Sequence, residues 1–157
     1  MASALQNVEF KILNPKLIER GWLPERATGG AAGYDLRSCE DVAVTLHPQQ
    51  SYKFRLGFAI HISDPQIAAL IMPRSGLGSR GLCLANTIGL IDSDYTGEIS
   101  TVARNWLPEG GDSITIEPGH RIFQLVLVPV IAANFVMVDE FTTASDRGEG
   151  GYGSTGT

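Results

Sequence analysis

The stretch RIFQLVLVPV, residues 121–130, reads as a β-strand of unusual character. From Ile122 to Val130 it is more continuously apolar than a strand on a protein surface would be, so we expect both of its faces to be covered. A central strand of a single domain would satisfy this pattern, and so would a strand covered by another subunit. The sequence leaves both arrangements open.

Shorter strand candidates lie on either side of this stretch. Residues Val8–Leu13 and Val42–Leu46 alternate between apolar and polar side chains, which is the period of a half-buried strand. Turn signals such as Asp64-Pro65 and Pro118-Gly119 separate the candidates. Further predicted strands are Leu56–Ile62, Ile67–Met72, Glu98–Val102, Ser113–Ile116 and Phe135–Val138, with one short helix between Gly76 and Gly81. Many short strands joined by turns predict an all-β sandwich or barrel.

Composition agrees with a single domain of this class. A chain of 157 residues that is 43% hydrophobic can bury one ordinary core but hardly two, so residues 1–157 are interpreted as one domain. Charged residues make up only 18%, while 18 glycines and 8 prolines favour turns over helical bundles.

Charge and rare residues exclude several classes of function. A net charge of -5 argues against binding to nucleic acid or to an anionic membrane, both of which need excess Lys and Arg. The three histidines have no metal-ligand spacing, and Cys39 and Cys83 are interpreted as free thiols. With no apolar run of membrane-spanning length and no signal-peptide pattern, we expect a cytoplasmic protein.

Two glycine-punctuated segments have the composition of anion or metal sites. Pro73–Gly78 combines an Arg, a Ser and two glycines, which can donate to phosphate oxygens, although a strand-ending turn with a solvated Arg fits it equally well. Ala31–Leu36 places Asp35 among small and apolar residues, where a carboxylate is costly unless it is paired, hydrated or facing a metal ion. An Asp at the edge of a strand is the alternative.

The segment Gly89–Ile99 reads as a β-hairpin whose turn contains Asp92, Ser93 and Asp94. Turns favour Asp and Ser, and Tyr95 beside them is compatible with ordinary cross-strand packing. A carboxylate held at such a turn could also accept a proton from a water molecule that attacks a phosphoryl group.

The glycine-rich end, Asp146–Thr157, cannot form a core by itself, and a disordered tail is its simplest interpretation. Gly148–Gly153 matches the Gly-x-Gly-x-x-Gly fingerprint, but no strand, helix and second strand surround it, so a dinucleotide site is rejected.

Taken in order, these segments resemble the five motifs of the trimeric dUTP pyrophosphatase family. The resemblance runs from about Phe10 to the C-terminus. The motifs are Ala32–Leu36, Pro73–Gly78, Gly89–Ile99, Pro118–Gln124 and Asp146–Gly156.

The resemblance implies a jelly-roll-like β-barrel over residues 1–145 and a flexible arm over residues 146–157. It also implies a homotrimer in which each active site uses motifs of all three subunits, and the arm closes over a neighbour's site. The implied reaction is hydrolysis of dUTP to dUMP and pyrophosphate with Mg²⁺, which keeps uracil out of DNA and supplies dUMP for thymidylate synthesis.

The resemblance also implies a role for each motif residue. Asp92 would orient the attacking water and contact the sugar 3'-hydroxyl, Gln124 would help to position the water and phosphates, and Tyr95 would pack under the deoxyribose and exclude a 2'-hydroxyl. Asp35 would meet magnesium through water. The base would be read by Asn86 and the backbone of Gly89, Leu90 and Ile91, the phosphates held by Arg74, Ser75 and Gly76, and the closed site completed by Arg147, Tyr152, Gly153, Ser154, Thr155 and Gly156.

Several positions depart from the family pattern. Phe123 stands where a small residue is usual, Arg104 replaces an aromatic residue, and the loop 106–111 is longer than in typical bacterial members. Tyr152 replaces a more frequent Phe, and either ring can stack on a base. Two rival functions remain, a dCTP deaminase of related fold and a nucleotide-binding regulator without turnover.

Overall fold

The stretch that opens the sequence analysis forms strand β10 (Arg121–Pro129), which lies between β2 (Tyr34–Arg37) and β5 (Ile67–Pro73). Strand β7 (Gly89–Ile91) completes this four-stranded antiparallel sheet in the order β2-β10-β5-β7. The structure is a computed structural model that describes residues 7–143, 145 and 148–150. The central position of β10 agrees with one of the two arrangements, and within the single protomer Ile122, Phe123 and Leu125 are buried while residues 126–128 are only partly buried.

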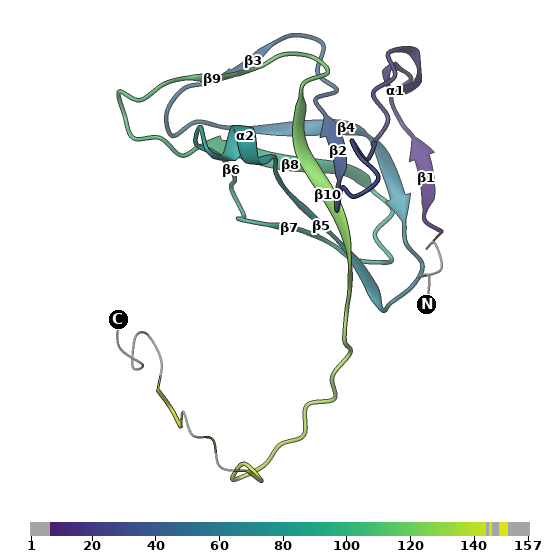
Figure 1. Ribbon diagram of the computed structural model, residues 1–157, viewed down its shortest axis with the longest axis vertical. Coiled ribbons are helices and arrows are strands. Elements are labelled where there is room, and N and C mark those ends of the chain that lie inside the picture. The colour runs from purple at the N-terminus through teal and green to yellow at the C-terminus, as the bar shows by residue number, and fades with distance from the viewer. Residues whose placement is uncertain (1–6, 144, 146–147, 151–157) are drawn as a thin grey trace.

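A second four-stranded antiparallel sheet has the order β1-β4-β8-β6. Its strands are β1 (Glu9–Ile12), β4 (Ser51–His61), β8 (Glu98–Asn105) and β6 (Leu82–Leu84). A two-stranded sheet pairs β3 (Val44–Leu46) with β9 (Ile114–Ile116) at one end of the molecule (Figure 1).

The core fills the space between the two larger sheets. Phe54 of β4 and Phe123 of β10 meet edge to face, with ring centroids 6.1 Å apart, and both are fully buried. The remaining core consists mainly of Leu and Ile side chains that point inward from alternate positions of each strand. Phe123, one of the departures from the family pattern, is therefore a core residue that joins the two sheets.

Two other departures, Arg104 and the loop 106–111, meet at the far end of β8. The guanidinium of Arg104 lies over the ring of Trp106, 5.3 Å from its centroid, and donates to Oε1 of Gln49. Nε2 of Gln49 donates to the carbonyl oxygens of Trp106 and Leu107. Arg104 and the longer loop therefore form one locally bonded structure in place of an aromatic side chain.

The expected all-β, jelly-roll-like fold is confirmed, but the sheets do not close into a barrel. Two helices of four residues each lie within the described ranges, α1 (Lys16–Glu19) and α2 (Ser75–Gly78). Helix α2 begins and ends slightly earlier than predicted. Across the described ranges, no helix is long and apolar enough to cross a membrane.

The predicted strand Phe135–Val138 is wrong. Residues 130–143 have no helix or strand and leave the body as an extended segment (Figure 1). Phe135 is 95% exposed and Met137 99% exposed. The pattern of side chains suits a strand, but a strand also needs a partner edge, and within one protomer this segment lies away from every sheet.

The predicted hairpin Gly89–Ile99 is also wrong, because its two arms do not pair with each other. Strand β7 pairs with β5, whereas β8 pairs with β4 and β6, so the two arms belong to different sheets. The turn between them is a connection from one sheet to the other. Gly89 explains part of this choice, because a Cβ there would lie 3.2 Å from Cβ of Ile71, so β7 packs closely against β5.

Candidate active site

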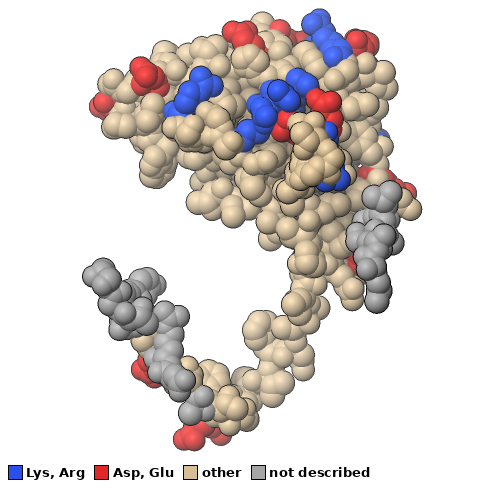
Figure 2. Space-filling view, viewed as in Figure 1, with Lys and Arg blue, Asp and Glu red and all other residues tan. Residues whose placement is uncertain are grey.

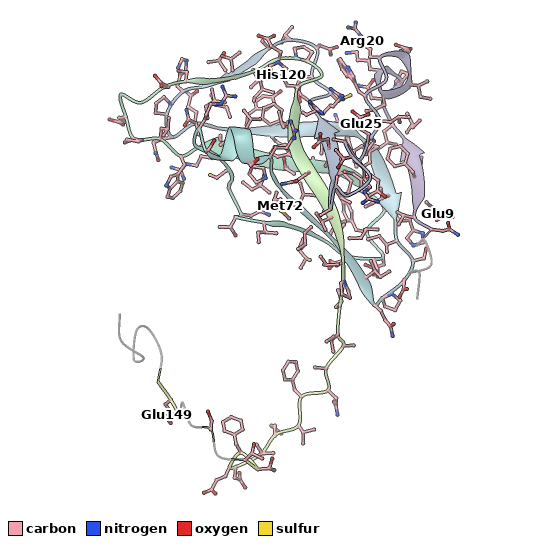
Figure 3. All side chains as sticks on the ribbon, in the orientation of Figure 1. Glu9, Arg20, Glu25, Met72, His120 and Glu149 are labelled. Atoms are coloured by element: carbon pink, nitrogen blue, oxygen red, sulfur yellow. The ribbon has the colours of Figure 1, made fainter. Side chains whose placement is uncertain are left out.

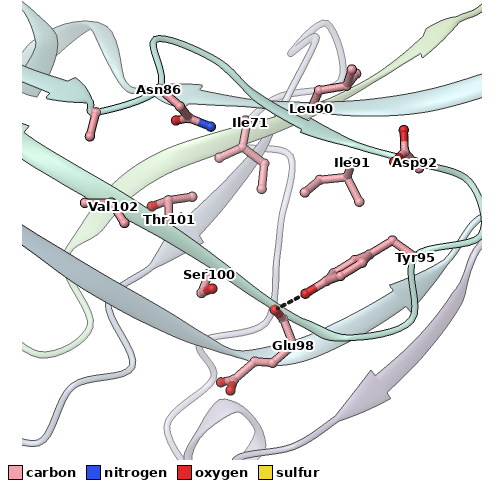
Figure 4. Close-up of a pocket in the computed structure, with 12 residues that line it drawn as sticks. Ile71, Asn86, Leu90, Ile91, Asp92, Tyr95, Glu98, Ser100, Thr101 and Val102 are labelled. Carbon is pink, nitrogen blue, oxygen red and sulfur yellow. Dashed lines mark hydrogen bonds between the residues drawn. The ribbon is translucent and has the colours of Figure 1, made fainter.

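A cavity of about 560 Å³ opens where the chain passes from β7 to β8 (Figure 4). Asn86, Leu90, Asp92 and Tyr95 line it, all of them predicted site residues. The full lining is Ile71, Ala85, Asn86, Gly89, Leu90, Ile91, Asp92, Tyr95, Glu98, Ser100, Thr101 and Val102. Its volume and mostly apolar walls suit a small organic ligand with a few polar groups.

Asp92 lies on a turn whose backbone is fixed at both sides. The amide of Tyr95 donates to the carbonyl oxygen of Asp92 at 3.2 Å, which closes the turn. The amides of Ile62 and Ser63 both donate to the carbonyl oxygen of Ser93, at 3.2 and 3.1 Å, which ties the turn to the end of β4. The exposed Asp92 side chain therefore stands on a rigid support at the mouth of the cavity.

The ring of Tyr95 forms one wall of the cavity. Its hydroxyl donates to the backbone carbonyl oxygen of Glu98 at 3.1 Å, as the dashed line in Figure 4 shows. Gly97 lies against this ring, since a Cβ at Gly97 would be 2.5 Å from the Tyr95 hydroxyl oxygen. The ring position depends on the absence of a side chain at residue 97.

Glu98 connects the same wall to the neighbouring strand β4. Its Oε1 accepts the amide of Gly57 at 3.2 Å and its Oε2 accepts Nε of Arg55 at 2.7 Å. The hydrogen bond to Glu98 raises the pKa of the Arg55 guanidinium. Gly57 has φ +76 at the register shift between Arg55 and Ala59, a conformation that side chains rarely adopt.

A second hollow, of about 480 Å³, lies beside α2 and the start of β10. It is lined by Arg74, Ser75, Gly76, Leu77, Arg80, His120 and Arg121. Figure 2 shows basic side chains gathered across this face of the molecule. Three guanidinium groups, a hydroxyl and a glycine backbone form the donor set that anionic oxygens require.

Asp35 lies behind this hollow and is almost fully buried. Its Oδ1 forms an ion pair with Arg74, 2.8 Å from Nε, and its Oδ2 accepts a hydrogen bond from Nη1 of Arg121 at 3.2 Å. The carboxylate thus holds two of the arginines in place, a role that the sequence alone does not reveal.

Gln124 lies close to the same end of the sheet, where it is paired in register with Asp35 on one side and with Met72 on the other. Its side-chain amide donates to the carbonyl oxygen of Pro73 at 3.3 Å, directly before Arg74. The structure therefore brings Gln124, Asp35 and the Arg74 segment together.

The Asp92 turn lies at the opposite end of β5 from Arg74. Ile91 is paired with Ala69, and Arg74 follows five residues further along the still-extended chain, which corresponds to about 16 Å. Strand β7 runs antiparallel to β5, so Asp92 points further away. One protomer therefore separates the predicted catalytic carboxylate from the predicted phosphate-binding arginine.

Whether the protein could hold a metal ion depends on the His, Cys, Asp and Glu side chains that lie close together. In the part of the chain that the structure describes, no group of three or more His, Cys, Asp or Glu residues could hold a metal ion. Both oxygens of Asp35 already face guanidinium groups. These residues form no site of protein ligands alone for a metal ion, so a divalent cation here would have to reach Asp35 through water.

Comparison with known proteins identifies the chain. The dUTPase family model matches residues 19–156. The chain belongs to the dUTPase family. A deoxyuridine 5'-triphosphate nucleotidohydrolase of Enterobacter sp. (strain 638) is 50% identical over 97% of this chain and 98% of that protein.

Solved dUTPase structures share the fold. The dUTPase of Staphylococcus bacteriophage 80alpha with dUpNHpp has a TM-score of 0.82 and 29% identity, covering 98% of this chain and 100% of that one. A mutant dUTPase of S. aureus phage phi11, whose structure shows the coordination of a structural Mg(II) ion, has a TM-score of 0.73 and 25% identity, covering 87% and 99%.

Some residues that line the two hollows were not predicted. Glu98, Ser100, Thr101 and Val102 line the first cavity because β8 runs beneath it, and Arg80 enters the second hollow from beyond α2. The first group belongs to a strand whose sequence resembles any other strand, so nothing marks its residues as part of a site. A single Arg on the surface likewise gives no indication of a binding site. The predicted residues Arg147, Tyr152, Gly153, Ser154, Thr155 and Gly156 lie outside the described residues.

The contact of Gly97 with Tyr95 predicts the effect of adding one methyl group. Gly97→Ala must displace the Tyr95 ring, so we expect the KM for dUTP to rise by at least roughly tenfold. The melting temperature should change little, because only the far end of an exposed side chain has to move. Steady-state kinetics and thermal melts of Gly97→Ala, with Gly30→Ala as control, measure both; an unchanged KM would show that the ring position is not critical.

Proposed function

We propose that this member of the dUTPase family hydrolyses dUTP to dUMP and pyrophosphate by water attack on the α-phosphorus. The observation that carries the proposal is the exposed Asp92 carboxylate on a fixed turn at the mouth of a nucleoside-sized cavity. Asp92 orients a water molecule and accepts its proton while the water oxygen bonds to phosphorus. The bond from that phosphorus to the bridging oxygen breaks, and pyrophosphate leaves.

The cavity is proposed to hold the deoxyuridine part of the substrate. Asn86 and the backbone of Gly89, Leu90 and Ile91 read the uracil edge, since they line the same wall. Tyr95 packs against the deoxyribose, where its ring leaves no room for a 2'-hydroxyl. The anchoring of the ring to Glu98 supports this role, because a steric filter must be held rigidly.

The second hollow is proposed to hold the phosphates through Arg74, Ser75 and Gly76. Gln124 helps to position the phosphate chain and the water. Mg²⁺, meeting Asp35 through its water shell, would neutralise charge on the phosphates. The tail would complete the site when Tyr152 stacks on the base and Arg147, Gly153, Ser154, Thr155 and Gly156 close over the phosphates.

We also propose that three copies assemble and share their sites. The separation of about 16 Å between the Asp92 turn and Arg74 along β5 supports sharing, because one phosphoryl group cannot easily meet both from one protomer. The extended segment 130–143 supports assembly. It exposes large apolar side chains that need a cover, namely Ile131, Phe135, Val136, Met137, Val138 and Phe141. The cytoplasmic location stays a prediction from the sequence.

The proposed role of Asp92 can be tested by comparing its substitution with the same substitution at Asp94. Asp92→Asn should lower kcat by about 10² to 10⁴, the usual contribution of a general base, while binding of dUpNHpp stays measurable. Asp94→Asn is a matched control, because Asp94 is an exposed carboxylate on the same turn, and it should keep nearly full turnover. Equal losses in both variants, or none in Asp92→Asn, would refute the assignment.

Substrate preference tests the reaction itself. Pyrophosphate release from dUTP, UTP, dCTP and dTTP should be fast for dUTP alone, and a chelator should abolish it. Rapid hydrolysis of UTP would contradict the exclusion by Tyr95. Ammonia from dCTP would indicate a deaminase, and binding without turnover of any nucleotide would indicate a regulator.

Removal of the tail tests its proposed part in the site. A chain ending at residue 146 should lose most of its turnover but keep its melting temperature, since the buried core ends at Leu125. Arg147→Gln in the full chain should reproduce part of the loss. The idea fails if the shortened chain keeps full turnover, or if it no longer folds.

A further inference from the structure

His120 lines the phosphate-side hollow together with Arg74, Arg80 and Arg121. It lies just before β10, in the turn that follows β9, and its side chain is exposed (Figure 3). None of the roles assigned above involves this imidazole. An imidazole among three arginines is suited to bind the oxygen atoms of an anion such as a phosphate group.

A hydrogen bond in the turn determines which ring nitrogen can donate. The backbone amide of Glu117 donates to Nδ1 of His120 at 3.1 Å, so Nδ1 acts as an acceptor. A neutral imidazole with an accepting Nδ1 carries its proton on Nε2. The ring therefore offers an N–H donor without being charged.

The backbone of the turn supports a fixed position for the ring. The amide of Ser38 donates to the carbonyl oxygen of His120 at 2.8 Å, and the amide of Gly119 donates to the carbonyl oxygen of Ser38 at 2.8 Å. Gly119 packs against Trp22 so closely that a Cβ there would lie 2.6 Å from the indole. The imidazole thus projects from a well-anchored turn.

The charged groups around His120 are mostly arginines. Arg74, Arg80 and Arg121 line the same hollow, and Arg37 donates to the carbonyl oxygen of Gly119. A proton on Nδ1 would also break the bond from the Glu117 amide. On the acidic side, Asp35 is paired with two of these arginines and Glu25 with Arg37, at 2.8 Å, and the exposed Glu117 side chain lies on the adjoining turn.

We propose that His120 is an additional phosphate-binding residue, whose neutral imidazole donates from Nε2 to a phosphate oxygen of the nucleotide. This inference rests on the proposed function, in which Arg74, Ser75 and Gly76 hold the same phosphates. A neutral donor adds an oriented hydrogen bond to three positive charges already present.

Three substitutions at residue 120 in the full chain separate the proposed Nε2 hydrogen-bond donor from the Nδ1 bond that supports the turn. His120→Leu removes both nitrogens and should weaken dUpNHpp binding about tenfold, as loss of a hydrogen bond to a charged group does. His120→Gln places an amide N–H near the position of Nε2 and should restore most of the affinity. His120→Asn can keep the bond to the Glu117 amide but does not reach as far, and it should bind as weakly as His120→Leu.

Calorimetric titration with dUpNHpp and Mg²⁺ measures these affinities, with deoxyuridine as the ligand without phosphates. Deoxyuridine binding should be the same in all variants, and His47→Leu, at the distant bond to Ser113, should bind dUpNHpp normally. Rescue by Asn but not by Gln would assign His120 to turn structure only and overturn the proposal. A wild-type advantage over His120→Leu that grows as pH falls from 8 to 6 would overturn the neutral donor.

Arg74→Gln separates this inference from the function on which it rests. If Arg74→Gln weakens dUpNHpp binding but His120→Leu does not, only the role of His120 is wrong. If Arg74→Gln has no effect, the phosphate site itself is wrongly placed. Weakening by both, with rescue by His120→Gln, supports the two together.

Discussion

The buried carboxylate of Asp35 is the constraint on which the phosphate side of the molecule depends. A carboxylate with so little exposure is costly unless it is paired, and here each oxygen lies against a different guanidinium. One comes from Arg74 at the end of β5 and the other from Arg121 at the start of β10. The pair of bonds therefore orients two arginines from different strands toward one hollow, and it does so before any ligand arrives.

The nucleoside side depends on a different device, the passage of the chain from one sheet to the other. Strand β7 is held against β5 and β8 against β4, so the turn between them bridges the two layers of the fold. Bonds from the end of β4 fix this turn, and Glu98 ties its far end to the bulge at Gly57. Both halves of the site thus rest on rigid strands, at opposite ends of β5.

The sequence predicted this architecture where a pattern has one structural meaning. The alternation of Val8–Leu13 and the apolar run of β10 led to real strands, and the order of five motifs led to the family. It failed where one pattern has two meanings. Two apolar arms around Asp92 describe a hairpin and a crossing between sheets equally well, and Phe135–Val138 has a strand's side chains but no partner edge within the protomer.

Other features were missed because the local sequence contains no pattern that indicates them. Strand β6 and helix α1 have three and four residues, too few for periodicity to show. Glu98 and Arg80 belong to the site through neighbours that are distant in sequence. Likewise, the pairing of Asp35 with Arg121, 86 residues away, could not be read from either segment.

In the assembly proposed above, the exposed segment 130–143 would make the stability of the folded protein depend on protein concentration. Its aromatic and aliphatic side chains are exposed to water in a single copy, so dilution would destabilise the protein if neighbouring copies cover them. Newly made copies would share that exposure until they found each other. The same residues would then serve assembly in the folded complex and be a source of misassociation before it forms.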